Sequence, residues 1–293
     1  MSDVFLLGRQ RALADARELL WDNLEESIWW DKYRDLTASE LSAEKIRLQH
    51  ENFHPVLVSF QTSFVPTILE VQNEAARLVL QYGASRRLAS IYAAMNVIAD
   101  VSYPARSEVC SEEEHGRLSD ALMIFYVSIP AFFDALSMAS HRVFQPKHYS
   151  EKDADLFSRK YWDAIGLIEG YSNISGFTGW FRRIKNVMRH PYAHRIPPYV
   201  PAAEHSIEDA EKNKRLQAAY STALVEKRFD DLSRIMGDQR RLGTFSPKIY
   251  FFEEDSWTPL NPTVFEDLFT FQVAALSMLE ALLPSEGFLN KGT

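Results

Sequence analysis

The sequence predicts a mainly α-helical protein, and three observations lead to this prediction. Apolar residues recur every three or four positions along most of the 293-residue chain, which is the period of a helix. Glycine occurs only 11 times. Only residues 248–252, KIYFF, have the composition of a β-strand. One short strand cannot form a sheet by itself, so the expected fold is all-α with at most one short strand or hairpin near residues 246–253.

Composition and charge exclude several classes of protein. The chain is 46% hydrophobic and 25% charged, which is typical of a globular protein rather than a disordered or fibrous one. Its 40 acidic and 32 basic residues give a net charge of −8, so a polyanion would need a local basic patch. The single cysteine, Cys110, excludes a disulfide framework and a cysteine-rich zinc site, and it favours a reducing cytoplasm. Residues 1–11 lack the basic and apolar regions of a secretory signal, which also favours a cytoplasmic protein.

Three helices are expected in the stretch before residue 104, and the first has a face formed by Leu13, Leu20, Leu24 and Ile28. Apolar residues step by three or four from 57 to 82, where Pro66 should kink the helix and Gly83 should end it as a C-terminal cap. A third helix over residues 88–98 should stop before Pro104, because proline disfavours a helical residue before it.

A soft domain boundary is expected where polar residues and a proline interrupt the helices, near residues 103–110. The sequence therefore predicts two regions. Residues 1–105 would form an N-terminal helical region packed on the core, and residues 106–293 would form the main helical domain.

The pair Ser111 and Glu114 forms a capping box that begins the most apolar helix of the chain. Part of this helix, residues 121–139, approaches the length of a membrane span, but it contains Pro130 and Asp134. A central aspartate costs about 2.5–3.5 kcal/mol on insertion scales. We therefore expect a buried core helix and no membrane association.

The remaining elements follow from caps and periodicity. Helices are expected from Ser150 with Asp153 to Tyr171, from about Ile174 to Arg189, from Ser206 onward with one solvated face, and from the cap Thr263 with Glu266 to Leu283. Between them, residues 196–202 contain three prolines and should end the helical run abruptly.

The charge of the chain reverses locally between Gly170 and Ala203, where there is no acidic residue. The bases of this stretch are Arg182, Arg183, Lys185, Arg189 and Arg195. Three of them, at 182, 185 and 189, share one face of a helix, whereas Phe177, Phe181, Ile184 and Met188 form an apolar stripe for the core. The basic face either binds a phosphate-bearing partner or pairs with acids elsewhere in the fold.

His190 and His194 follow the basic face, and histidine can transfer protons near neutral pH. Pro191 lies between them and removes a backbone donor, so the helix should bend or restart there. On a straight helix Arg189 and His194 would point roughly 140° apart. Their convergence therefore needs the bend or a second protomer.

The pattern around these residues resembles the signature of the HEPN superfamily (higher eukaryotes and prokaryotes nucleotide-binding). In that signature an arginine, here Arg189, is followed after four to six residues by a histidine, here His194. A polar residue follows the arginine, here His190. The surrounding sequence VMRHPYAHR is similar to that of the family. Two departures are Pro191 inside the motif and Ile196 where a subset of the family has tyrosine. The first hundred residues have no counterpart in the minimal family bundle.

The resemblance implies an up-and-down helical bundle and a metal-independent endoribonuclease of the kind found in toxin, antiphage and RNA-processing systems. Arg189 and His194 would be the catalytic pair, supported by His190, in a composite site formed by a homodimer around one RNA strand. No cofactor or metal is expected. The partners implied are RNA, a second copy of the chain, and an antitoxin or defence-system protein.

The residue types permit a simple mechanism. A neutral histidine takes the proton of the ribose 2′-hydroxyl, which attacks the adjacent phosphorus, and arginine neutralises the charge that builds on the phosphate oxygens. The products would carry a 2′,3′-cyclic phosphate and a 5′-hydroxyl. Basic residues would hold other phosphates, and Tyr192 would either stack on a base or pack in the loop. The expected phosphate-binding residues are Arg182, Lys185 and Arg195.

Other interpretations remain open at this point. The chain could be a catalytically silent HEPN-like module for nucleotide or RNA binding, or for assembly. His190 and His194 could instead bind zinc, with a third ligand from His115, His141, His148 or an acid. Asp134, within the apolar helix, could orient Arg189 or His194, or could belong to a buried polar network.

Overall fold

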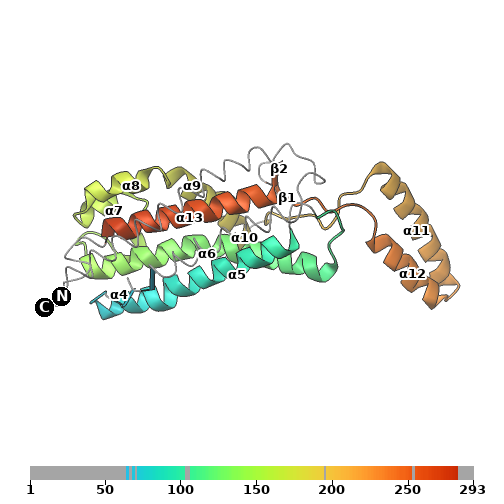
Figure 1. The fold of residues 1–293 in the computed structure, drawn as a ribbon, viewed down its shortest axis with the longest axis horizontal. Helices are drawn as coiled ribbons and strands as arrows, with labels where there is room; N and C mark the ends of the chain where they lie inside the picture. Colours follow the sequence, from blue (N-terminus) through green and yellow to red (C-terminus); the bar gives the residue numbers. More distant parts are fainter. Residues whose placement is uncertain are drawn as a thin grey trace.

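The longest helix, α6 (Glu112–Phe144), forms the centre of the helical bundle in the computed structural model (Figure 1). The structure describes residues 64–65, 68–69, 71–102, 106–194, 196–252 and 255–282, apart from the side chains of residues 193, 194, 261, 262, 266, 269 and 280. Ser111 begins α6 with the predicted capping box, because its hydroxyl accepts from the amide of Glu114 and the Glu114 carboxylate accepts from the amide of Ser111. The described part of the chain is thus mainly helical, as predicted.

Helix α6 has the length and hydropathy of a membrane span, but most of its apolar surface is covered by other helices. It packs against α4 (Glu74–Val79), α5 (Ser85–Val101) and α13 (Leu260–Leu282). Its Phe132 and Phe133 rings make edge-to-face contacts with Phe271 of α13, at 5.0 and 5.6 Å between ring centroids. Burial on this scale explains its apolar composition, as expected for a core helix.

The prediction that Gly83 caps a helix is wrong. The chain continues from α4 through a π-helical segment, Leu80–Ala84, directly into α5. A Cβ on Gly83 would lie 3.1 Å from the Cβ of Ala135 on α6. Glycine at this position therefore permits close contact between two helices and does not end one.

The expected helix over residues 57–82 is also interrupted within its described part. Residues 71–73 are not helical, and α4 begins at Glu74 after the N-cap Asn73, whose side chain accepts from the amide of Ala76. Residues 57–63 and Pro66 lie outside the described residues, as do the helix face expected at residues 13–28 and the rest of residues 1–56. Helices α4 and α5 belong to the same hydrophobic cluster as α6 and α13, and the proposed boundary between 105 and 106 stays a prediction.

The prediction of a single helix from Ser150 to Tyr171 is wrong, because this stretch forms short separate segments. They are a 3₁₀ turn at Glu151–Asp153, α7 (Arg159–Ala164) and a 3₁₀ turn at Ile168–Tyr171, followed by α8 (Ser172–Ser175). The Asp155 carboxylate accepts from the amide of Phe157, which stabilises a turn. Gly166 has φ +75°, a left-handed conformation that ends α7.

A helical hairpin of α11 (Ile207–Val225) and α12 (Phe229–Arg240) extends away from the bundle (Figure 1). Ser206 and Asp209 form the capping box that begins α11, which confirms the predicted start. The hairpin has a small hydrophobic cluster of its own, formed by Ala223, Leu232 and Ile235 with Leu216 and Tyr220 beside it. The described part of the hairpin therefore does not share the main core.

The predicted strand is one half of a two-stranded antiparallel sheet. Strand β1 (Lys248–Phe251) pairs with β2 (Ser256–Pro259), and Tyr250 lies opposite Trp257. Helix α13 follows β2 directly and begins at Leu260, so Thr263 is not its N-cap. The Thr263 hydroxyl donates instead to the carbonyl of Pro259, and the Glu266 side chain lies outside the description.

Candidate functional site

One continuous helical rod carries the motif that the sequence analysis singled out. It consists of α9 (Thr178–Arg183), a π-helical turn (Ile184–Arg189) and α10 (His190–His194). The amide of His190 donates to the carbonyl of Lys185, five residues back, immediately before Pro191. Proline cannot donate within an α-helix, and a π-turn is one way to accommodate it. The helix therefore does not restart at Pro191, and the backbone adjusts in the preceding turn.

The apolar face of this rod is buried as predicted. Phe181, Ile184 and Met188 are all inaccessible to solvent or nearly so. Phe181 stacks on Phe157 with 3.7 Å between ring centroids and meets Phe133 of α6 edge to face. This packing fixes the rotation of the rod, so Arg182 and Asn186 are held toward the surface.

Arg183 is already paired with a buried acid of the protein and is therefore not free to bind a ligand. It forms an ion pair with Asp267 of α13, which also accepts from the Trp180 indole and the Tyr126 hydroxyl, each at 3.0 Å. Burial and the Asp267 charge raise the pKa of Tyr126 well above its usual value, so this phenol stays protonated as a donor. Of the five basic residues between Gly170 and Ala203, Arg183 therefore pairs with an acid of the protein and does not contribute to a phosphate-binding face.

Arg189 lies beside Asp134 of α6 and is only loosely held by it. The distance from its Nη2 to Asp134 Oδ2 is 3.9 Å, and both side chains are half-exposed. Burial raises the pKa of the Asp134 carboxyl, whereas Arg189 and Lys185 favour its charged form. An exposed pair of this kind contributes at most about 1 kcal/mol, so an incoming phosphate could displace it.

Lys185 and Arg182 differ in their surroundings although both belong to the predicted basic face. The Lys185 ammonium lies 5.4 Å from the centre of the Phe181 ring and within electrostatic range of Asp134. Arg182 is exposed and forms no ion pair with the described residues. The structure therefore brings Lys185 and Arg189 together around Asp134.

The histidine half of the motif is only partly described. His190 is exposed at the start of α10. The backbone of His194 belongs to α10, but its side chain lies outside the description, as does Arg195. The distance between Arg189 and His194 therefore stays a prediction.

Tyr192 occupies a packing position. Its ring lies against the main core, and its hydroxyl donates to the carbonyl of Pro198 at 3.2 Å. Burial raises its pKa. This arrangement favours loop packing over the base-stacking role that was the other interpretation.

Within the described ranges, no three His, Cys, Asp or Glu side chains converge on a point where a metal ion could bind. His115, one of the residues considered as a third zinc ligand, has its Nε2 only 2.7 Å from the carbonyl oxygen of Val200. That nitrogen is therefore engaged in a hydrogen bond.

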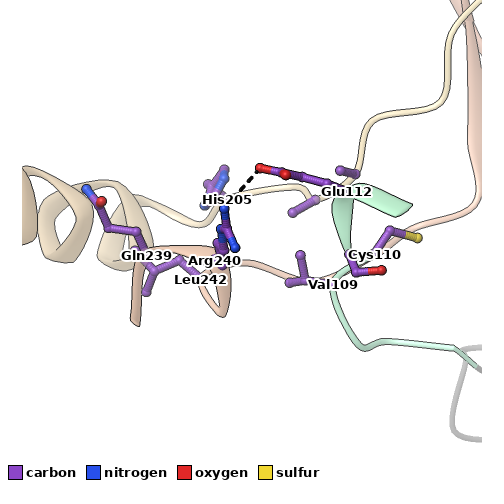
Figure 2. Close-up of a pocket in the computed structure, with 10 residues that line it drawn as sticks. Val109, Cys110, Glu112, His205, Gln239, Arg240 and Leu242 are labelled. Atoms are coloured by element: carbon purple, nitrogen blue, oxygen red, sulfur yellow. Dashed lines mark hydrogen bonds and ion pairs between the residues drawn. The ribbon is translucent and has the colours of Figure 1, made fainter. Parts of the chain in front are cut away.

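A cavity of about 510 Å³ lies elsewhere, at the base of the hairpin (Figure 2). Residues of the α6 start, of the chain before α11 and of the α12 end line it, and none belongs to the motif. Its two charged groups, Arg240 and Glu112, pair with each other at 3.4 Å. Cys110 is buried at its edge, where burial raises the pKa of the thiol, so the thiol is a poor nucleophile.

No family model, curated protein or solved structure matches this chain. The assignment of a function therefore depends on the residues and their geometry alone.

Proposed function

We propose that the chain is a metal-independent endoribonuclease that cleaves single-stranded RNA by attack of the 2′-hydroxyl. The observation that supports this most is the position of Arg189. It is half-exposed, weakly paired with Asp134 alone among the described acids, and placed on a helix whose rotation is fixed by buried residues. Arginine in that state can exchange its carboxylate for a phosphate oxygen.

In the proposed mechanism His194 removes the proton of the 2′-hydroxyl, and His190 supports the motif as its polar residue. Arg189 stabilises the negative charge on the phosphate oxygens in the transition state. Arg182 and Lys185 hold neighbouring phosphates by charge. No step requires a metal ion, and DNA is not cut because it lacks the nucleophile.

The experiment that tests the proposal is RNA cleavage in excess EDTA by the wild type, Arg189→Ala and His194→Ala. We expect each variant to lose about 10²-fold or more of the rate, which is the scale of general acid–base catalysis. Arg215→Ala, which removes an exposed arginine of α11, is the matched control and should keep full activity. Cleavage that persists in both motif variants, or that needs added metal, would contradict the assignment.

We further propose that the chain folds as an up-and-down HEPN-like bundle. Two copies would form a two-fold dimer with a composite site. Support for a dimer comes from α6, where two large apolar side chains, Met123 and Ile124, are exposed to solvent. Sedimentation should show a dimer at micromolar concentration. A monodisperse monomer would contradict this part of the proposal. An antitoxin or defence-system protein remains a proposed partner, and the cytoplasm the proposed location.

A second function is favoured by the position of Lys185. Because Lys185 and Arg189 share Asp134, part of the basic face already has a protein partner. A catalytically silent module that binds RNA would show this arrangement too. Binding of RNA without cleavage across varied substrates would support that function over the nuclease.

A further inference from the structure

Four aromatic side chains form a compact cluster on the outer face of the β-hairpin. We call this cluster, Tyr199, Tyr250, Phe252 and Trp257, the aromatic face. Their ring centroids lie between 4.7 and 6.2 Å apart in each of the five closest pairs. Tyr199 is 40% exposed, and Phe252 and Trp257 are each 47% exposed. Such a group of large exposed rings is unusual on a surface that serves no binding role.

The pleat of the sheet explains why the rings gather. Ile249 and Phe251 of β1 point into the core, so Tyr250 and Phe252 alternate to the outside. Trp257 lies directly opposite Tyr250 on β2. On the other edge, Tyr199 exchanges two backbone hydrogen bonds with Tyr250, of 3.2 and 2.9 Å. Backbone pairing therefore holds Tyr199, Tyr250 and Trp257 in place, and Phe252 follows β1 directly.

The aromatic face is joined in sequence to the proposed catalytic motif. Tyr199 belongs to the acid-free stretch between Gly170 and Ala203 and follows His194 by five residues. Its bridge to Tyr250 ties the end of that stretch to the sheet. A ligand that contacts both the motif and the aromatic face would therefore have to combine phosphate groups with flat rings.

We propose that the aromatic face binds unpaired bases of single-stranded RNA by stacking. This inference rests on the proposed function and names the form of RNA that the site takes. Every base has a flat π-face, so stacking on aromatic rings is tolerant of sequence but requires the base to be unpaired. Double-stranded RNA, whose bases are already stacked and paired, is not a ligand of this face.

The charges around the aromatic face indicate where the sugar–phosphate backbone runs. Asp255, at the turn between β1 and β2, accepts a hydrogen bond from the Tyr250 hydroxyl. Lys248 is paired with Glu204 at 3.2 Å and offers little net charge. Asp255 follows Glu253 and Glu254 in the sequence, so phosphates would be repelled from this end and the backbone would lie on the Tyr199 side. That side is also where the chain arrives from the motif.

The test uses a short fluorescent single strand with 2′-O-methyl riboses, which cannot be cut by 2′-hydroxyl attack. The main variant, Phe252→Leu with Trp257→Leu, keeps apolar side chains and removes two rings. We expect its affinity for the strand to fall at least tenfold, because each stacked base contributes about 1–3 kcal/mol, or roughly 5- to 150-fold. Phe252→Tyr, which retains a ring, should bind as the wild type does. Phe229→Leu, an exposed phenylalanine of α12, is the matched control.

An abasic strand of the same length gives a second readout. The wild type should bind the abasic strand weakly. The double variant should bind the abasic strand with the same affinity as the wild type. Equal affinity of the wild type and the double variant for the base-containing strand would overturn the inference and indicate that the face serves a protein partner. Normal stacking without any cleavage of RNA would leave the inference standing while the nuclease proposal fails. If the wild type cleaves RNA but the double variant binds the strand as well as the wild type does, the nuclease proposal stands and this inference fails.

Discussion

At the scale of single residues, Asp267 connects three helices of the described core. Its carboxylate is buried in α13 and accepts from Tyr126 of α6 and from Trp180 and Arg183 of α9. A buried acceptor with several charged or polar donors is costly to disturb, because each donor is left without its partner. This residue positions the rod that carries Arg189, although it lies far from Arg189 in sequence.

Replacing Asp267 by asparagine should lower the free energy of unfolding by about 1–3 kcal/mol, since the charge that Arg183 pairs with is lost. The matched control is Asp120→Asn, an exposed acid on α6, which should change stability by less than about 0.5 kcal/mol. Urea unfolding of the two variants measures the difference. Equal stabilities would show that the network contributes nothing.

Asp134 should give the protein a small pH dependence of stability. Burial raises the pKa of the Asp134 carboxyl in the folded state. The stability that the protonated carboxyl contributes is therefore fully present below the unfolded-state pKa of about 3.9, and it is lost as the pH rises through the folded-state pKa. Asp134→Asn stays neutral throughout. The stability of this variant relative to the wild type should therefore increase from about pH 3.5 to pH 7, by less than about 1 kcal/mol because the side chain is half-exposed. Unfolding curves across this range that show the relative stability falling would mean that pairing with Arg189 outweighs burial.

At the scale of elements, the rod formed by α9, the π-turn and α10 carries Arg182, Lys185 and Arg189, for which we propose two different roles. Arg182 and Lys185 precede Arg189 on this rod, and neither forms an ion pair among the described residues, although Lys185 lies within electrostatic range of Asp134. Their proposed role is to hold phosphates at a distance from the reacting one.

Changing Arg182 and Lys185 together to alanine should flatten the salt dependence of binding to single-stranded RNA. The log–log slope should fall by about 1.4, or 0.7 for each lost phosphate contact. The rate at saturating RNA should change little. Lys212→Ala with Lys214→Ala, two exposed lysines of α11, is the matched control. An unchanged slope would mean that the basic face pairs with protein acids, and a collapse of the saturated rate would place these residues in the active site.

Elements with a local signal could be predicted from sequence, and those fixed by distant residues could not. The capping boxes at Ser111 and Ser206 and the strand KIYFF depend on neighbours within a few residues, and the structure has all three. The role of Gly83 depends on α6, which approaches it at Ala135. No local pattern reveals that contact, so a cap was the natural but wrong interpretation.

The same contrast applies to the candidate site. The apolar stripe of Phe181, Ile184 and Met188 could be predicted, because helical spacing alone defines it. The ion pair of Arg183 could not be predicted, since its acid partner Asp267 is 84 residues away in the sequence. Nor does sequence spacing indicate that Tyr199 meets Tyr250 across the sheet. Contacts of this range become visible only once the chain is folded.

At the scale of the whole molecule, the hairpin of α11 and α12 is an appendage with a small core of its own. Its two ends are adjacent, because Glu204 and Thr244 exchange two backbone hydrogen bonds of 2.8 and 2.9 Å. The chain could therefore be closed across this bridge without the hairpin. The main core contains no described residue between 203 and 244.

Replacing residues 207–241 by a short glycine–serine linker should leave the bundle folded. We expect the melting temperature to change by no more than a few degrees, since about 1 kcal/mol corresponds to roughly 2–4 °C in a protein of this size. Circular dichroism during heating measures it. Loss of cooperative unfolding would show that the hairpin is required for the core.

We propose that Arg189 and His194 cut RNA through the 2′-hydroxyl without a metal. The most direct measurement is the mass of the 3′ ends formed from a defined RNA in excess EDTA. The wild type should form 2′,3′-cyclic phosphate ends, and His194→Ala should form none above background. Ends that carry a 3′-hydroxyl, or cyclic phosphate ends formed equally by His194→Ala, would contradict it.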